Sequence, residues 1–256
     1  MQRFLVGLGG VVAVVVLVFC ISVSVGTAAS LAQDMDQDGL PDIWEAMVYR
    51  TNPALADTDS DGYPDRVEML NGYNPIGEGR LVEGDYDHDG LSDRLELVFE
   101  TDPTLVDTNG DGKNDGQQLR DGVSPTSTIP VLLQKSLFIH LKTQKLDMRV
   151  NNVTIASYPV STGLPRTPTP VGTFKVLQKN PRAWSNSAKL WMPYWMHFSG
   201  RGHGVHELPE WPGGRKEGEN HLGKVASHGC IRLGVGAAKA VYDWSPVGTP
   251  IVVSKL

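Results

Sequence analysis

The chain has 256 residues, of which 40% are hydrophobic, and a formal net charge of −6 at pH 7. This length can hold two modest domains. The charge is divided unevenly, because Asp34–Asp121 carries 23 acidic and 6 basic residues, whereas Ile129–Leu256 carries 6 acidic and 16 basic ones. So abrupt a change excludes a single domain of uniform charge. It predicts a boundary at residues 122–130, in a stretch rich in turn formers.

Residues 1–32 form an apolar segment at the N-terminus. After Arg3 no charged residue occurs until Asp34, so the run approaches the roughly 20 residues that span a bilayer. TAA (27–29) and SLA (30–32) offer small-residue cleavage sites. The segment is therefore either a cleaved signal peptide or an N-terminal anchor in the inner membrane. Either one exports the rest of the chain, and the expected location is the periplasm or cell wall.

The acidic half, residues 34–121, repeats one twelve-residue frame four times. Oxygen-bearing side chains at positions 1, 3, 5, 9 and 12, with glycine at position 6, have the spacing of a calcium loop, to which position 7 adds a backbone carbonyl. A solvated acidic run would not repeat one frame. The predicted Ca²⁺ ligands are Asp34, Asp36, Asp38, Leu40, Asp42 and Glu45 in loop 1; Asp57, Asp59, Asp61, Tyr63, Asp65 and Glu68 in loop 2; Asp85, Asp87, Asp89, Leu91, Asp93 and Glu96 in loop 3; and Asp107, Asn109, Asp111, Lys113, Asp115 and Gln118 in loop 4.

The loops recur in pairs, since Asp34 and Asp85 begin equivalent loops 51 residues apart. The segments that follow the loops are too short for independent EF-hand helices, so short helices are expected. The pattern resembles the bacterial thrombospondin type 3 repeat, in which calcium ions largely replace a hydrophobic core. Loop 4 departs from it, because Asn109 and Gln118 put neutral amides at positions 3 and 12, and this loop should bind calcium more weakly.

The basic half, residues 131–256, alternates short β-like runs with Gly, Pro and Asn turns, which predicts a mostly-β domain. The runs are SLFIHL (136–141), KLDMRV (145–150), TIASYPVS (154–161), TFKVLQ (173–178) and PIVVSKL (250–256). One amphipathic helix is expected at residues 234–245. Nothing here resembles a nucleic-acid module, and an exported basic domain favours an anionic envelope polymer as its partner.

Cys230, in the motif SHGCIRL, is an unpaired thiol, because Cys20 lies in the apolar segment. A leftover cysteine in an exported protein is either inert and buried or reactive. A reactive thiol needs a nearby base or cation, and His228, His206 and His203 are the candidate bases. These residue types indicate acyl transfer.

Several ordered motifs of this half resemble the L,D-transpeptidase catalytic domain of the YkuD type. They are SYPVSTG with RTPTPVGTF, WMPYWMHF, GVHEL, HLGKVASHGCIRL and VGTPIVV. The resemblance implies a mixed β-sandwich with a short helix after the catalytic cysteine. It also implies cysteine acyl transfer on peptidoglycan stem peptides, with Cys230 as nucleophile and His206 as base. The remaining implied roles are oxyanion-site residues Ser227, His228 and Gly229, a loop- or carboxylate-holding Arg232, and groove-lining Tyr194 and Trp195.

Three functions remain open for this half. A transpeptidase passes the acyl group to an amine and makes 3–3 cross-links, an L,D-carboxypeptidase passes it to water, and a non-catalytic wall-binding protein would have an inert Cys230. We expect neither a catalytic cofactor nor a nucleic acid partner. The protein is expected to be a monomer.

Two features depart from the family pattern. Glu207 follows His206 where Gly or Ser is common, and its carboxylate either raises the basicity of the imidazole or points to solvent. The stretch 209–220 is an insertion between base and nucleophile, and it is either a lid or a surface loop.

Overall fold

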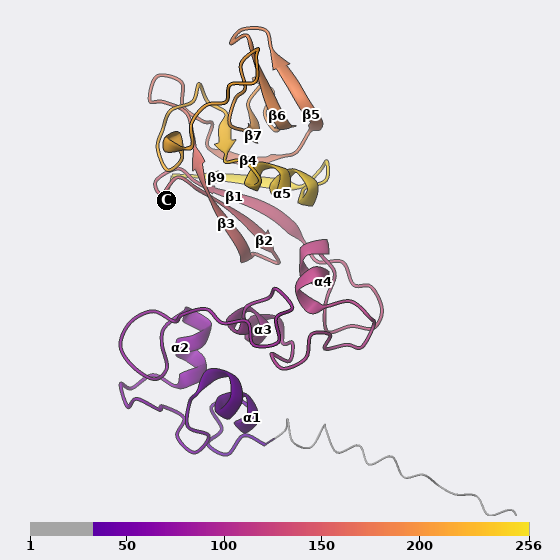
Figure 1. Cartoon of the computed structure of the whole chain (residues 1–256). Helices are drawn as coiled ribbons and strands as arrows, with labels where there is room; N and C mark the ends of the chain where they lie inside the picture. The colour runs from indigo at the N-terminus through magenta and orange to yellow at the C-terminus, as the bar shows by residue number, and fades with distance from the viewer. Residues whose placement is uncertain (1–32, 256) are drawn as a thin grey trace, which may run out of the picture.

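The computed structural model describes residues 33–255, which form a loop-rich region joined to a β-rich region (Figure 1). The N-terminal segment 1–32, with its predicted leader or anchor, lies outside the described residues. No helix within residues 33–255 has the length and apolar character needed to cross a bilayer. The helices of the loop-rich region are α1 (Asp42–Trp44) with the π-helical turn η1 (Glu45–Tyr49), α2 (Asp65–Asn71), α3 (Asp93–Phe99) and α4 (Asp115–Asp121).

Each α-helix of the loop-rich region begins at the ninth position of its loop, always an aspartate. That carboxylate accepts the backbone N–H of the loop's second residue, for example from Thr58 to Asp65 at 2.8 Å, and so closes the loop. The helical segments end at residues in the left-handed conformation, such as Gly72 with φ 73° and Gly122 with φ 75°, a position that favours glycine. The expectation of short helices is confirmed.

The loop-rich region is joined to the β-rich region through shared apolar packing. Leu40, Tyr49, Met69 and Leu97 form a small cluster of their own. Leu95, on the same helix as Leu97, belongs instead to the main core. Helix α3 therefore contributes to two cores. The predicted linker 122–130 is folded back, because the Leu133 N–H donates to the Gly122 carbonyl at 2.8 Å and Val123 bridges Leu132.

The β-rich region is one nine-stranded sheet in the order β4-β9-β1-β2-β3-β8-β7-β6-β5. Its strands are β1 (Lys135–His140), β2 (Lys145–Val150), β3 (Val153–Ser161), β4 (Gly172–Lys175), β5 (Gln178–Ser185), β6 (Leu190–His197), β7 (Gly204–Glu207), β8 (Ile231–Leu233) and β9 (Pro250–Ser254). The β1–β9 and β7–β8 pairs are parallel and the others antiparallel, so the mostly-β, mixed class is confirmed.

The two layers expected of a sandwich are parts of this single sheet. They meet where β3 pairs with β8 over only Val160–Leu233 and Ser161–Arg232. Helix α5 (Ala237–Trp244) lies against the second half of the sheet (Figure 1), and its buried face joins a core shared by both halves. The helix expected at 234–245 is thus confirmed. Because β7 and β8 are adjacent and parallel, residues far apart in sequence are brought side by side there.

Candidate functional site

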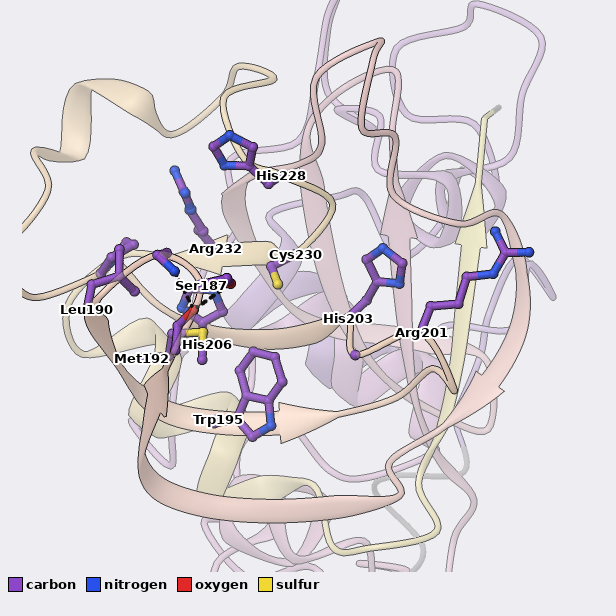
Figure 2. A pocket seen from close by; sticks show the side chains of 14 residues that line it. Ser187, Leu190, Met192, Trp195, Arg201, His203, His206, His228, Cys230 and Arg232 are labelled. Atoms are coloured by element: carbon purple, nitrogen blue, oxygen red, sulfur yellow. Dashed lines mark hydrogen bonds between the residues drawn. The ribbon is translucent and has the colours of Figure 1, made fainter.

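A pocket of about 540 Å³ opens beside β7 and β8. Cys230 immediately precedes β8, and His206 in β7 is registered against Arg232 in β8. The Cys230 sulfur points into the space bounded by His203, His206 and Trp195 (Figure 2). The structure therefore brings the predicted nucleophile and the predicted base into one cavity.

The loop before Cys230 is held by hydrogen bonds to its own backbone. Ser227 Oγ donates to the Cys230 carbonyl at 2.5 Å and accepts the Gly229 N–H at 3.1 Å. Thr169, in the RTPTPVGTF turn, donates to the Gly229 carbonyl at 3.0 Å. Gly229 has φ 110°, and a Cβ there would lie 2.6 Å from the His203 ring. Only glycine allows this conformation and this close approach.

His206 is fully enclosed, with 2% of its surface exposed. Its Nδ1 lies 2.5 Å from the carbonyl oxygen of Glu207. A carbonyl oxygen only accepts, so Nδ1 carries the proton and Nε2 is left as an acceptor. Burial first, and then the charge of Arg232, lowers the His206 pKa to about 3, against the opposing effect of the Glu207 hydrogen bond. The imidazole is therefore neutral at pH 7 and able to accept a proton at Nε2.

Burial also raises the pKa of the Cys230 thiol, although a backbone hydrogen bond from Gly204 and the charge of Arg232 oppose this effect. The resting pair is accordingly a neutral thiol and a neutral imidazole. Trp195 covers the pair, with its ring centroid 5.6 Å from that of His206. A Cβ at Gly204 would lie 2.5 Å from the Trp195 ring, so this glycine lets the indole close over the site.

The Glu207 side chain takes neither of the two orientations considered above. Its carboxylate is buried, 2% exposed, and pairs with Lys216. The ring-orienting group is the backbone carbonyl of Glu207, which any residue at this position supplies. Both predicted roles for the Glu207 carboxylate are therefore wrong.

The insertion 209–220 is held by contacts at several points. Glu210 forms backbone hydrogen bonds with Trp191 at 2.8 and 3.0 Å. The Glu217 carboxylate lies 2.8 Å from Arg232 and 2.6 Å from His221. Arg232 is therefore paired with a carboxylate of its own chain. This pairing is compatible with its predicted role of holding the loop, but it occupies the guanidinium that was predicted to bind a substrate carboxylate.

Tyr194 does not reach the pocket. It has φ 53°, and its ring packs against Tyr242 of α5 with 5.7 Å between the centroids. The predicted groove-lining role of Tyr194 is wrong, whereas Trp195 lines the pocket. The alternation of a strand explains the difference, since consecutive residues face opposite sides.

A second pocket, of about 760 Å³, adjoins the first. Arg201, His203 and His228 line both. His228 is exposed, and His203 Nδ1 lies 2.8 Å from Ser199 Oγ. Arg201 and Glu217 were not identified from the sequence, because no local pattern predicts that an exposed arginine will line the Cys230 pocket or that a loop glutamate will pair with Arg232. Thr169 could have been found, since its motif had been matched.

The predicted calcium loops gather their carboxylates as expected from the spacing. In loops 1–3 the aspartates at positions 1, 3 and 5 have ligand atoms within 4.8 Å of one another. Buried carboxylate oxygens without a hydrogen-bond partner occur in these same loops of the described chain; they belong to Asp36, Glu45, Glu68, Asp85, Asp87 and Glu96. Three of them are the position-12 glutamates. A cluster of orphaned, converging anionic oxygens fits a hard cation.

Burial and neighbouring carboxylates raise the pKa values of these groups. The pKa is raised to about 7 for Glu45 and Glu68, to about 6 for Asp87 and to about 9 for Glu96. In each case desolvation contributes most, and adjacent aspartates add to it. The protein itself therefore does not compensate the negative charge that these carboxylates acquire when they ionise.

Loop 4 is different, because its two amide side chains donate hydrogen bonds. Gln118 Nε2 donates to Asp111 Oδ2 at 3.0 Å, and Asn109 Nδ2 donates to the Ser127 carbonyl at 2.9 Å. The Gln118 amide thus donates to a carboxylate of its own loop, where loops 1–3 have a glutamate. This loop fits a cation less well than the other three.

Comparison with known proteins identifies the family of the β-rich region. The family model of the YkuD L,D-transpeptidase catalytic domain matches residues 134–253. "Putative L,D-transpeptidase YciB" of Bacillus subtilis is 33% identical over 135 residues, which cover 49% of this chain and 69% of that protein. "Putative L,D-transpeptidase YkuD" of the same organism is 25% identical over 129 residues, covering 49% of this chain and 70% of that protein. An L,D-transpeptidase structure from Mycobacterium smegmatis matches with a TM-score of 0.43 and 24% identity, and the match covers 50% of this chain and 64% of that one. The chain belongs to the YkuD L,D-transpeptidase family, and residues 134–253 are its catalytic domain.

Proposed function

We propose that this chain is an exported L,D-transpeptidase that joins peptidoglycan stem peptides by 3–3 cross-links. Cys230 Sγ attacks the carbonyl carbon between the diacid at stem position three and the terminal D-alanine. His206 Nε2 takes the thiol proton and returns it to the departing amine as the C–N bond breaks. An amine of a second stem then attacks the thioester, forms the new amide and releases the Cys230 thiol.

One observation carries this proposal: a neutral imidazole, locked at Nδ1 by the Glu207 carbonyl, shares a pocket with an unpaired thiol. A base with its free nitrogen exposed to the nucleophile is what general-base activation of a neutral thiol requires. The Gly229 N–H is engaged by Ser227 Oγ, so we infer that the Cys230 N–H is the loop donor that stabilises the oxyanion.

The test is incubation of the full chain with stem tetrapeptides, followed by mass analysis of protein and products. Transpeptidation gives an acyl-enzyme and peptide dimers, with Cys230→Ala as the control that gives neither. Tripeptides without dimers would assign the carboxypeptidase reaction instead. Unchanged substrate and an unmodified thiol would overturn the enzymatic proposal and favour a wall-binding protein.

We further propose that Ca²⁺ fills loops 1–3 and that the acidic region serves as a spacer between the N-terminal segment and the catalytic domain. The orphaned oxygens of the position-12 glutamates support this role. The small four-residue apolar cluster of the region also supports it, because metal binding must then contribute much of the folding free energy. Extracellular calcium modules bind calcium with dissociation constants of about 10⁻⁴–10⁻³ M, so ambient calcium can fill such sites.

Small-angle scattering of the full chain with calcium or with chelator tests the spacer. Chelation should increase the radius of gyration while activity on soluble tetrapeptides persists. Unchanged dimensions would contradict the spacer. Loss of soluble-peptide activity would instead mean that the loops support the catalytic pocket directly, through the shared packing of Leu95.

A further inference from the structure

We propose that Arg201 is the carboxylate-binding residue of the stem-peptide site, in place of Arg232. This inference rests on the proposed function, because it assumes an anionic peptide at Cys230. The two arginines lie on opposite sides of the cysteine, with Arg201 beyond His203 (Figure 2). Their environments differ in a way that assigns them different tasks.

Arg232 already has a carboxylate partner. Its Nη1 lies 3.0 Å from Glu217 Oε1 and 2.8 Å from Oε2, and both side chains are largely buried, 11% and 13% exposed. Its unpartnered Nε is buried, so a substrate carboxylate that bound at Nη1 would have to displace Glu217 and would exchange one ion pair for another. Displacing Glu217 would also leave a buried carboxylate without its cation, which is costly. Arg232 is therefore better described as a structural cation.

Arg201 has no such partner. It is exposed, and within residues 33–255 its side chain makes no hydrogen bond or ion pair. The residues lining the two pockets include no aspartate or glutamate. An uncompensated guanidinium in a cavity without acidic residues favours an anionic ligand, and its planar fork suits a carboxylate.

The position of Arg201 suits a peptide that reaches Cys230. Arg201 lines both the 540 Å³ pocket, which holds the cysteine, and the adjoining 760 Å³ pocket. A peptide lying across the shared boundary places the groups next to its scissile bond beside this residue. The charge of Arg201 also lowers the His203 pKa, after the larger effect of burial, so the guanidinium acts electrostatically on the site.

Two carboxylates of the tetrapeptide have this chemistry: the terminal one and the one on the diacid residue. The experiment uses three peptides, namely the free acid, a peptide amidated at the terminus and a peptide amidated at the diacid side chain. Each is assayed with the wild-type chain and with Arg201→Gln, Arg201→Lys and Arg215→Gln. Arg215 is an exposed arginine that lines neither pocket, so its variant is the matched control.

Arg201→Gln should lower kcat/KM for the free acid about 10- to 100-fold, mainly through KM, because a charge-assisted hydrogen bond contributes on the order of 1.5–3 kcal/mol. Arg201→Lys should recover part of this loss, and Arg215→Gln should leave kcat/KM unchanged. The peptide amidated at the bound carboxylate should react equally with wild type and Arg201→Gln. That equality identifies which carboxylate is bound.

Equal activity of wild type and Arg201→Gln on the free acid would overturn the proposal, as would an equal loss on all three peptides. Peptide affinities measured by calorimetry in the Cys230→Ala background, with and without Arg201→Gln, separate binding from chemistry. An affinity difference without any acyl-enzyme in the wild type would support the Arg201 site while refuting the transpeptidase function. No affinity difference would refute the Arg201 site whatever the reaction.

Discussion

Buried carboxylates behave in opposite ways in the two regions of this protein. Glu96, in the loops, is fully buried and its pKa is raised to about 9 by desolvation and by Asp87 and Asp89. Asp147, in the sheet, is also buried, and burial alone would raise its pKa. Hydrogen bonds from His140 and other donors outweigh that effect and lower the pKa. The carboxylate anion is thus stabilised at Asp147 in the sheet and destabilised at Glu96 in the loops.

The difference teaches where each region obtains its countercharge. The catalytic domain contains its own, since Asp147 lies 2.8 Å from His140 and 3.0 Å from Arg149. Its active-site arginine likewise pairs with Glu217. Loops 1–3 bring together carboxylates whose oxygens remain unpartnered within the described chain. Asp147 in the catalytic domain therefore has its countercharge within the polypeptide, whereas the carboxylates of loops 1–3 lack one there, which supports the proposed cation.

The largest expected effect is on the catalytic side of this comparison. His206→Ala should lower the acylation rate about 10²–10⁴-fold, because a positioned general base contributes that much. His203→Ala is the matched control, since it removes a second imidazole from the same pocket, and it should cost much less. Rates are measured by mass analysis of the acyl-enzyme. A more damaging His203→Ala would assign the base to the wrong histidine.

The pH dependence of acylation should reflect the lowered pKa of His206, about 3. The neutral imidazole is the active form, and it predominates above its pKa. In calcium-saturated protein, kcat/KM should not fall between pH 7 and pH 5 as it would for a base with the ordinary histidine pKa near 6.5. An acidic limb centred near pH 6.5 would contradict the buried, neutral His206.

The second effect concerns the stability of the loops. Glu45 and Glu68 have pKa values raised to about 7, and Glu96 to about 9, above their unfolded values. Without calcium the folded state binds more protons than the unfolded state, so the loops should lose stability from about pH 4.5 up to these values. Saturating calcium should reverse the sign, because the cation binds the deprotonated form. Hydrogen exchange of residues 34–106 at pH 5 and pH 8 measures both slopes. Equal slopes with and without calcium would contradict the metal sites.

The division into two regions could be predicted from the sequence, because charge, repeats and motifs are local properties. The strands at SLFIHL and KLDMRV appear as β1 and β2, since alternation alone defines them. The contacts of Glu217 and Arg201 could not be predicted, because they depend on how the insertion packs against β8. The prediction that Tyr194 lines the groove was wrong for a related reason. The sequence indicated an aromatic pair, but the sheet determines which face each residue lies on.

A smaller effect separates loop 4 from the others. Gln118→Glu should destabilise the chain without calcium by about 1–3 kcal/mol, because it replaces the amide that donates to Asp111 with a repelling carboxylate. Calcium should recover this loss. Glu68→Gln is the converse change and should reduce the stabilisation by calcium while relieving repulsion in its absence. Denaturant unfolding of both variants is measured with and without calcium. Equal responses of the two variants to calcium would mean that loop 4 is an ordinary calcium loop.

The smallest effect tests whether the insertion reaches the nucleophile. Glu217→Gln removes the carboxylate that neutralises Arg232, and the charge of Arg232 opposes the raised pKa of Cys230. The Cys230 pKa should therefore fall. Alkylation of the thiol at pH 8 should become about two- to fivefold faster, as expected for the loss of one partly screened ion pair. Glu219→Gln, an exposed neighbour, is the control and should leave the rate unchanged. Slower alkylation would mean that the released Arg232 moves away from Cys230. In that case Glu217 acts mainly by positioning the guanidinium, and the catalytic domain depends on its insertion for geometry as well as for charge.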